Sequence, residues 1–380
     1  MSLGERVRAA AEPHLGDAGV PGVVALIGRG DEVIVELFGN LDVGGAPVQR
    51  DSLFRIASTS KPITAAATLV VIEEGLIGLD EPVDRLLPEL AGRRVLVRPD
   101  GPLSSETVPA ERSITTRDLL TFTFGFGMVT EMFGPGAPWP VVAATRRLGL
   151  STIGPPNPDV QPDPDTWIAG LGTLPLLAHP GDRWMYNTGA SVLGVLLARA
   201  TGLPFADVLR TRLFEPLGMR DTGFWTADID RLATAYVAKP DGLAVWDPPD
   251  GQWSRAPAFG DGAAGLISTA DDLLAFSRML LTGGGSVLPA AAVRAMCSDQ
   301  LSDGQKAFGG LGPGFFARKS WGYCQAVYDG GAFGWNGGLG TSWIADPARD
   351  LTVIVMTQRL FESAELPQAH RDIQAAALGG

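Results

Sequence analysis

The chain has 380 residues, of which 45% are hydrophobic, enough for one large or two medium domains. Its formal net charge of −12 argues against a basic groove for nucleic acid. No apolar run reaches the roughly 18 residues of a spanning helix, and residues 1–15 lack the apolar segment of a secretory signal. We therefore expect a cytoplasmic protein without a membrane span. The spacing of its two cysteines and three histidines predicts no disulfide framework, no metal site and no cofactor.

Strand patterns lie at the two ends of the sequence. Near the start, apolar runs at 23–27 and 33–38 flank a short turn. Near the end, runs at 341–345 and 351–357 flank another turn, and residues 364–378 have the pattern of an amphipathic helix.

Helical spacing with Gly or Pro stops dominates the middle, at 58–75, 116–122, 189–201 and 204–217. Residues 268–271 resemble a capping box before a further helix at 273–281. The pattern predicts an α/β fold of the α+β type, in which an antiparallel sheet built from both termini is flanked by helices. We place this sheet domain at 1–57 plus 255–380, with a mainly helical domain inserted at 58–254.

Residues 125–167 form a long segment rich in proline, glycine and aromatic residues. Such a segment predicts either a lid or binding loop, or a loop that packs over the core without a function of its own.

A serine and a lysine stand three residues apart at the start of the first long helical pattern. Pro62 is tolerated only in the first turn of a helix, so the helix begins at or just after Ser58 and brings Ser58 and Lys61 onto one face. A neutral lysine amine can take the serine proton, and both burial and the positive end of a helix favour the neutral form.

The same spacing arises by chance about once in a few hundred residues. However, the 30 Lys and Arg residues include only four lysines (Lys61, Lys239, Lys306 and Lys319), which leaves 26 arginines. A scarce residue type at this position favours a specific role, because an arginine would stay protonated there.

Several stretches, in order, resemble the class C β-lactamase-like serine hydrolases, a family that includes penicillin-binding DD-peptidases, esterases, amidases and acyltransferases. These stretches are 54–67, 75–83, 114–121, 213–219 and 265–272. The resemblance implies the β-lactamase/transpeptidase-like fold, with Ser58 as nucleophile and Lys61 as its base.

Residues 180–189 resemble the tyrosine motif of this family. The resemblance implies that Tyr186 shares the role of base with Lys61 and later helps to activate water. Beside a cationic lysine, the phenol would titrate below its usual pKa near 10. A half-buried structural tyrosine is the alternative. Thr188 stands where the family often has asparagine, so Asn187 is given only a supporting role in substrate binding, and Trp184 is a candidate for the wall of the acyl pocket.

Residues 334–341 resemble the third motif of the family, a Lys-Thr-Gly or His-x-Gly triplet on a strand beside the active site. The resemblance implies that the backbone N–H groups of Ser58 and Gly338 form the oxyanion hole, and that Trp335, Asn336 and Gly337 contact the substrate. Trp335 replaces the usual cation, which is similar to the esterase members and favours uncharged acyl substrates. A glycine-rich hairpin with a core tryptophan is the alternative.

Together these patterns predict a serine hydrolase that cleaves a small-molecule ester or amide, with an ester favoured, through an acyl-enzyme on Ser58. Three alternatives stay open. The first is a β-lactamase or D-Ala-type peptidase or amidase, against which the missing cation and missing signal argue. The second is an acyltransferase in biosynthesis, which would use the same residues. The third is a non-catalytic binding protein on the same fold. The oligomeric state is not predicted.

Overall fold

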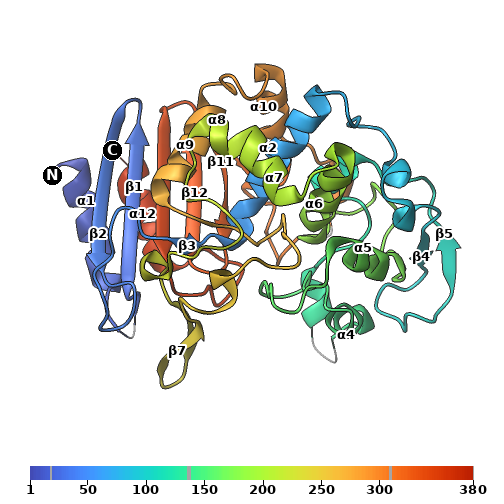
Figure 1. Ribbon diagram of the computed structural model, residues 1–380, viewed down its shortest axis with the longest axis horizontal. Coiled ribbons are helices and arrows are strands. Elements are labelled where there is room, and N and C mark those ends of the chain that lie inside the picture. The colour runs from blue at the N-terminus through green and yellow to red at the C-terminus, as the bar shows by residue number, and fades with distance from the viewer. Residues whose placement is uncertain (18, 135–137, 308–309, 380) are drawn as a thin grey trace.

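The computed structural model describes residues 1–380 except 18, 135–137, 308–309 and 380. Its largest sheet has seven antiparallel strands in the order β2-β1-β13-β12-β11-β10-β9 (Figure 1). Their bounds are β1 (Gly22–Arg29), β2 (Glu32–Gly39), β9 (Lys319–Trp321), β10 (Ala326–Tyr328), β11 (Phe333–Gly337), β12 (Thr341–Asp346) and β13 (Leu351–Thr357). The prediction of an antiparallel sheet made from both ends of the chain is therefore confirmed.

Both faces of the sheet are covered by helices. Along β1, Val23, Ala25 and Ile27 join the apolar cluster under α1 (Leu3–Ala11) and α12 (Gln368–Leu378). The alternate residues Val24 and Leu26 belong to the main core on the opposite face, which includes α9 (Ala270–Leu281). Because successive side chains of a strand point to opposite faces, a strand buried on both sides is apolar throughout.

The remaining helices come mainly from the middle of the chain, and α2 runs between them and the sheet (Figure 1). They are α2 (Ser60–Glu73), α3 (Thr116–Thr121), α4 (Pro140–Arg147), α5 (Pro164–Gly172), α6 (Thr188–Thr201), α7 (Phe205–Leu209), α8 (Glu215–Leu217), α10 (Ala290–Met296) and α11 (Asp303–Lys306). A π-helical turn at Arg210–Phe214 joins α7 to α8, so the helical pattern expected at 204–217 is present but not uniformly α.

Three two-stranded pairs complete the fold: β3 (Phe54–Arg55) with β8 (Ile267–Ser268), β4 (Arg94–Leu96) with β5 (Thr107–Pro109), and β6 (Ala235–Lys239) with β7 (Gly242–Asp247). The buried guanidinium of Arg55 donates to the carboxylate of Asp247 at 2.8 Å and stacks over Trp253. This ion pair fastens the segment that leads into Ser58 to the end of β7.

Two expectations about local structure need correction. The segment 125–167, expected to be irregular, contains α4 and the start of α5, because Pro140 and Pro164 each occupy the first turn of a helix, where proline is tolerated. Its residues 135–137 lie outside the described part. The helix expected after 268–271 is capped by Thr269, whose side chain accepts from the backbone N–H of Asp272, one residue later than expected.

Among the described residues, no single helix is long and apolar enough to cross a membrane. One pair, Thr188–Thr201 with Phe205–Leu217, passes that test only when joined, and it is bent by 82°.

Candidate active site

Ser58 lies in a tight turn at the junction of two elements. A 3₁₀ turn at Ala57–Thr59 follows β3 and leads directly into α2. Ala57 has φ of 42°, a left-handed conformation that a side chain rarely adopts. Ser58 is partly exposed, whereas Ala57 and Thr59 are buried. The surrounding structure therefore holds a strained backbone that presents one hydroxyl at the surface.

Lys61 is fully buried one turn further along. Its Nζ lies 2.9 Å from Oγ of Ser58 and donates to the carbonyl oxygen of Ala263 at 2.8 Å. Burial lowers the pKa of Lys61 from 10.5 to about 7, and the negative charge of Asp261 acts in the opposite direction. A substantial fraction of this amine is therefore neutral at neutral pH, which is the form that can accept a proton from Ser58.

Tyr186 reaches the same two side chains from the start of α6. The Lys61 Nζ lies 4.6 Å from the centre of its ring. Burial raises the pKa of Tyr186 well above its usual value, although hydrogen bonds with Ser58 and Trp335 act to lower it. This direction of the Tyr186 pKa is opposite to the one expected from the sequence, because the desolvation of the phenolate outweighs the two hydrogen bonds. The resting side chain is thus a phenol that is hydrogen-bonded to the nucleophile.

The indole of Trp335 holds the phenol in place. Its Nε1 donates to Oη of Tyr186 at 2.7 Å, and the two ring centres are 5.7 Å apart. Trp335 is only 6% exposed. Trp335, which occupies the position of the cation in other family members, therefore contacts Tyr186 directly. This contact was not expected from the sequence.

Strand β11 approaches the Ser58 turn so closely that only glycine fits at Gly337. A Cβ atom there would lie 2.1 Å from the carbonyl oxygen of Ile56, whereas at the exposed Gly338 it would meet nothing within 4 Å. The Thr341 hydroxyl also donates to the Ile56 oxygen, at 3.2 Å. The close contact holds the end of β11, and with it the neighbouring Gly338, beside the turn that carries Ser58.

Three residues that we expected to bind substrate have other surroundings. Trp184 is 1% exposed and packs behind Tyr186, with ring centres 5.7 Å apart, so it belongs to the core rather than to a pocket wall. Asn187 donates from Nδ2 to the Thr152 carbonyl oxygen at 2.9 Å, so it anchors another loop.

Asn336 is directed away from Ser58. It pairs with Ser342 across β11 and β12, and directly paired residues share a face of the sheet. The hydroxyl of Ser342 lies 2.9 Å from Nδ1 of His370 in α12, which identifies that face as the one opposite Trp335. The alternation of side chains along β11 therefore excludes the expected contact.

Asp261 is a buried carboxylate that the sequence motifs did not reveal. It accepts from the Ser191 hydroxyl at 2.6 Å and from the Ala263 N–H at 2.9 Å. Through that second bond it shapes the backbone turn whose Ala263 oxygen holds Lys61. The only signal in the sequence is an acidic residue within a run of small residues at 260–265, too common a pattern to identify it.

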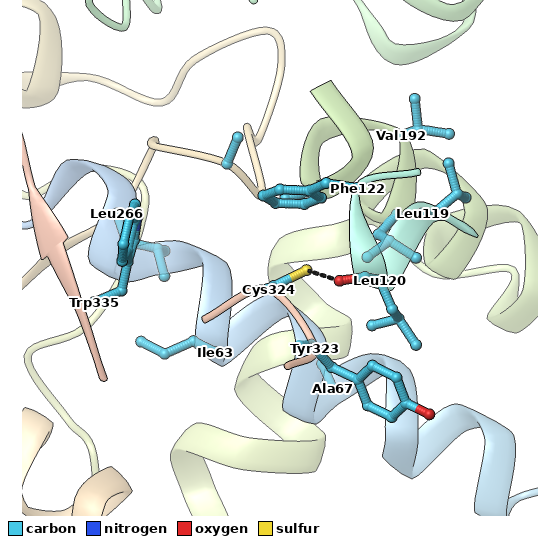
Figure 2. Close-up of a cluster of buried hydrophobic side chains, with 14 of the residues drawn as sticks. Ile63, Ala67, Leu119, Leu120, Phe122, Val192, Leu266, Tyr323, Cys324 and Trp335 are labelled. Atoms are coloured by element: carbon cyan, nitrogen blue, oxygen red, sulfur yellow. Dashed lines mark hydrogen bonds between the residues drawn. The ribbon is translucent and has the colours of Figure 1, made fainter. Parts of the chain in front are cut away.

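Cys324 is the second buried group near the lysine. Its Sγ donates to the Leu120 carbonyl oxygen at 3.4 Å, between α2 and the segment that carries Phe122 (Figure 2). Burial raises the pKa of this thiol well above its usual value. It is therefore an uncharged part of the wall around Lys61. No group of three His, Cys, Asp or Glu side chains within the described part of the chain is placed to hold a metal ion.

Comparison with known proteins places this geometry in a family. The family model described as Beta-lactamase matches residues 7–378, and the chain belongs to that family. Its fold is accordingly the one shared by β-lactamases and penicillin-binding proteins.

Relatives within the family indicate a hydrolase and acyl-transfer chemistry. The chain is 36% identical to Protein Rv1367c of Mycobacterium tuberculosis, over 96% of this chain and 90% of that protein. It is 32% identical to Esterase EstB of Burkholderia gladioli, over 96% and 93% of the two chains. The solved structure of EstCE1, described as a hydrolase with promiscuous acyltransferase activity, matches with a TM-score of 0.82 and 26% identity, over 99% and 98% of the two chains.

Proposed function

We propose that this protein hydrolyses carboxylic esters of small molecules through an acyl-enzyme on Ser58. The observation that carries the proposal is the 2.9 Å approach of the Lys61 amine to the Ser58 hydroxyl, at a site where burial lowers the pKa of Lys61 to about 7. A serine hydroxyl becomes an effective nucleophile only when a neighbouring base can take its proton.

In the first half of the reaction, the neutral amine of Lys61 accepts the Ser58 proton as Oγ attacks the ester carbonyl. The negative charge that develops on the carbonyl oxygen is stabilised by the backbone N–H groups of Ser58 and Gly338. Collapse of the tetrahedral intermediate breaks the bond to the alcohol. The proton returns from Lys61 through the phenol of Tyr186 to the leaving oxygen.

In the second half, water attacks the acyl group on Ser58 and loses its proton along the same route. The acid is then released, and Ser58 recovers its hydroxyl proton. The raised pKa of Tyr186 suits a group that relays protons without remaining ionised. The esterase relative supports an ester as the substrate, in preference to the amide of a peptidase or the lactam of a β-lactamase.

The test uses p-nitrophenyl butyrate and mass spectrometry of the intact protein. The wild type should release p-nitrophenol and carry a butyryl group on Ser58. S58A and K61M should each lose at least about 10²-fold in kcat/KM. K306M is the matched control, because Lys306, the last residue of α11, pairs with Asp299 rather than with Ser58, Lys61 or Tyr186. Wild-type activity in S58A or K61M would disprove the proposal.

Acyl transfer to an alcohol is a second candidate, supported by the likeness to EstCE1, whose description names promiscuous acyltransferase activity. It uses the same acyl-enzyme and differs only in the acceptor. Adding a short alcohol to the assay should produce a new ester at the expense of butyrate if transfer competes with hydrolysis. An unchanged yield of butyrate would show that the acyl-enzyme is hydrolysed and that the alcohol does not compete with water.

A further inference from the structure

Lys319, at the start of β9, has an unusual environment for a lysine. Its Nζ lies 4.0 Å from the ring centre of Phe315 and 5.6 Å from that of Trp335. Its ammonium makes no hydrogen bond or ion pair with the residues that the structure describes, and aromatic faces are its only partners there. Burial lowers the pKa of Lys319 to about 8.

Two other cations of the chain have a carboxylate partner. Buried Arg55 is paired with Asp247, and Lys306, which is partly exposed like Lys319, is paired with Asp299. Removing an ammonium from water without a carboxylate partner is costly, and cation–π contacts offset only part of that cost. Lys319 is also one of only four lysines in the sequence. The partly buried charge of Lys319, without a carboxylate partner in the described structure, is therefore available to an incoming anion.

The ammonium of Lys319 lies close to the candidate active site. The indole of Trp335, on which the Lys319 ammonium rests, is the same indole that donates to the Tyr186 oxygen. The strand order brings Lys319 and Trp335 close, because β9 and β11 are the two neighbours of the short strand β10. The ammonium is therefore one side chain away from the phenol of the proposed catalytic group.

The two rings beside this ammonium continue into an aromatic cluster in the core. Trp321 packs edge-on against Trp335 with ring centres 4.7 Å apart, and Trp184 packs against Phe315 at 5.2 Å. The Nε1 atoms of Trp321 and Trp184 are both buried without an acceptor in the described structure. These two N–H groups are enclosed in the core, whereas the Lys319 ammonium is partly exposed and can meet a ligand that brings negatively charged oxygen atoms.

We infer that Lys319 binds a carboxylate carried by the substrate, which lies against Phe315 and Trp335 while its ester bond reaches Ser58. The inference rests on the proposed ester hydrolysis for the identity of the ligand as substrate. The inference revises the expectation of an uncharged acyl group. That expectation was based on Trp335 alone, without the Lys319 ammonium that lies beside its ring.

The kinetic test compares esters that differ only in charge. On the acyl side, the pair is the p-nitrophenyl monoester of glutaric acid and its terminal amide. On the alcohol side, the pair is 3-butyryloxybenzoate and 3-butyryloxybenzamide. In at least one of these two pairs, kcat/KM of the wild type should be at least 10-fold higher for the ester with the carboxylate than for its amide. The difference should lie mainly in KM. K319M should abolish the preference while the rate on the amide stays within 2-fold, and K319R should retain part of it.

A binding measurement separates this inference from the proposed function. Tryptophan fluorescence of S58A is titrated with 4-phenylbutyrate and with 4-phenylbutanamide. The carboxylate should bind at least 10-fold more tightly, and S58A/K319M should lose that difference. Equal binding of the two compounds, with ester hydrolysis intact, overturns the carboxylate site alone. Tighter binding of the carboxylate by a protein that does not hydrolyse esters overturns the proposed function alone. Thermal melting of K319M and K319R confirms that both variants are folded.

Discussion

The indole nitrogen of Trp335 donates a 2.7 Å hydrogen bond to the phenolic oxygen of Tyr186, across 149 residues of sequence. Tyr186 is hydrogen-bonded to Ser58 in turn, so the two bonds link β11 to the nucleophile. A donor on the phenol oxygen fixes the direction of the ring and stabilises any negative charge that develops there.

Replacing Trp335 with phenylalanine removes this donor and keeps an aromatic ring. We expect W335F to lose roughly 5- to 10-fold in kcat on p-nitrophenyl butyrate, as removal of about 1–1.5 kcal/mol of hydrogen bonding implies. Y186F should lose about 10²-fold or more. In the double variant, W335F should have no further effect, because its partner oxygen is already absent. Additive losses would show that Trp335 acts without Tyr186.

The pH dependence of the reaction should follow Lys61. Its pKa of about 7 means that the neutral, proton-accepting form decreases below pH 7. We therefore expect kcat/KM for a neutral ester to be half-maximal near pH 7 and to fall as the pH decreases further. A profile that stays flat down to pH 5 would contradict this role for the amine.

Asp261 should set the position of that acid limb. Its negative charge raises the pKa of Lys61, so D261N should lower it and move the limb to lower pH. S191A is the matched control, because it removes a hydrogen bond to the same carboxylate and keeps the charge. The limb should stay in place in S191A. A shift of equal size in both variants would indicate a structural effect rather than one of charge.

An added methyl group should have different effects at Gly337, the last residue of β11, and at Gly338, which follows the strand. G337A places a Cβ against the Ile56 oxygen, and we expect a loss of about 2–3 kcal/mol in the free energy of unfolding together with a large loss of activity. G338A has open space around its Cβ and should melt at the wild-type temperature. Calorimetry of the two variants checks this contrast, and equal melting temperatures would refute it.

The ion pair between Arg55 and Asp247 should respond differently to single and double substitution. Both side chains are at most 3% exposed, so D247L leaves a buried guanidinium unpaired and should cost about 3–5 kcal/mol in the free energy of unfolding. R55M/D247L should recover most of that loss. Chemical denaturation measures both effects, and a double variant less stable than D247L would contradict the prediction.

The parts of the fold that could be predicted are those whose signal is local. The hairpin of β1 and β2, the strands β12 and β13 and the helix after Ser58 all follow from apolar periodicity and turn residues. The contact between Ser58 and Lys61 is also local, because three residues separate them on one turn.

The rest depends on contacts between distant segments. Asp261 lies 200 residues after Lys61, and Lys319 comes within reach of Trp335 only through the pairing of three short strands. The direction of the Tyr186 pKa was predicted wrongly because the sequence shows a nearby lysine but not the complete burial of the phenol. The helices within 125–167 were missed because prolines and glycines interrupt the helical periodicity there, although a proline at the first turn is compatible with a helix.

The order of strands in the large sheet also has a consequence for synthesis on the ribosome. β1 is joined to β12 only through β13, and residues 40–350 separate β2 from β13 along the chain. The first hairpin therefore emerges with the outer edge of β1 bare, and that edge stays unpaired until residues 351–357 have been made. Helices α2 to α6 can collapse earlier, but Gly338 cannot be held beside Ser58 until β13 has closed the gap.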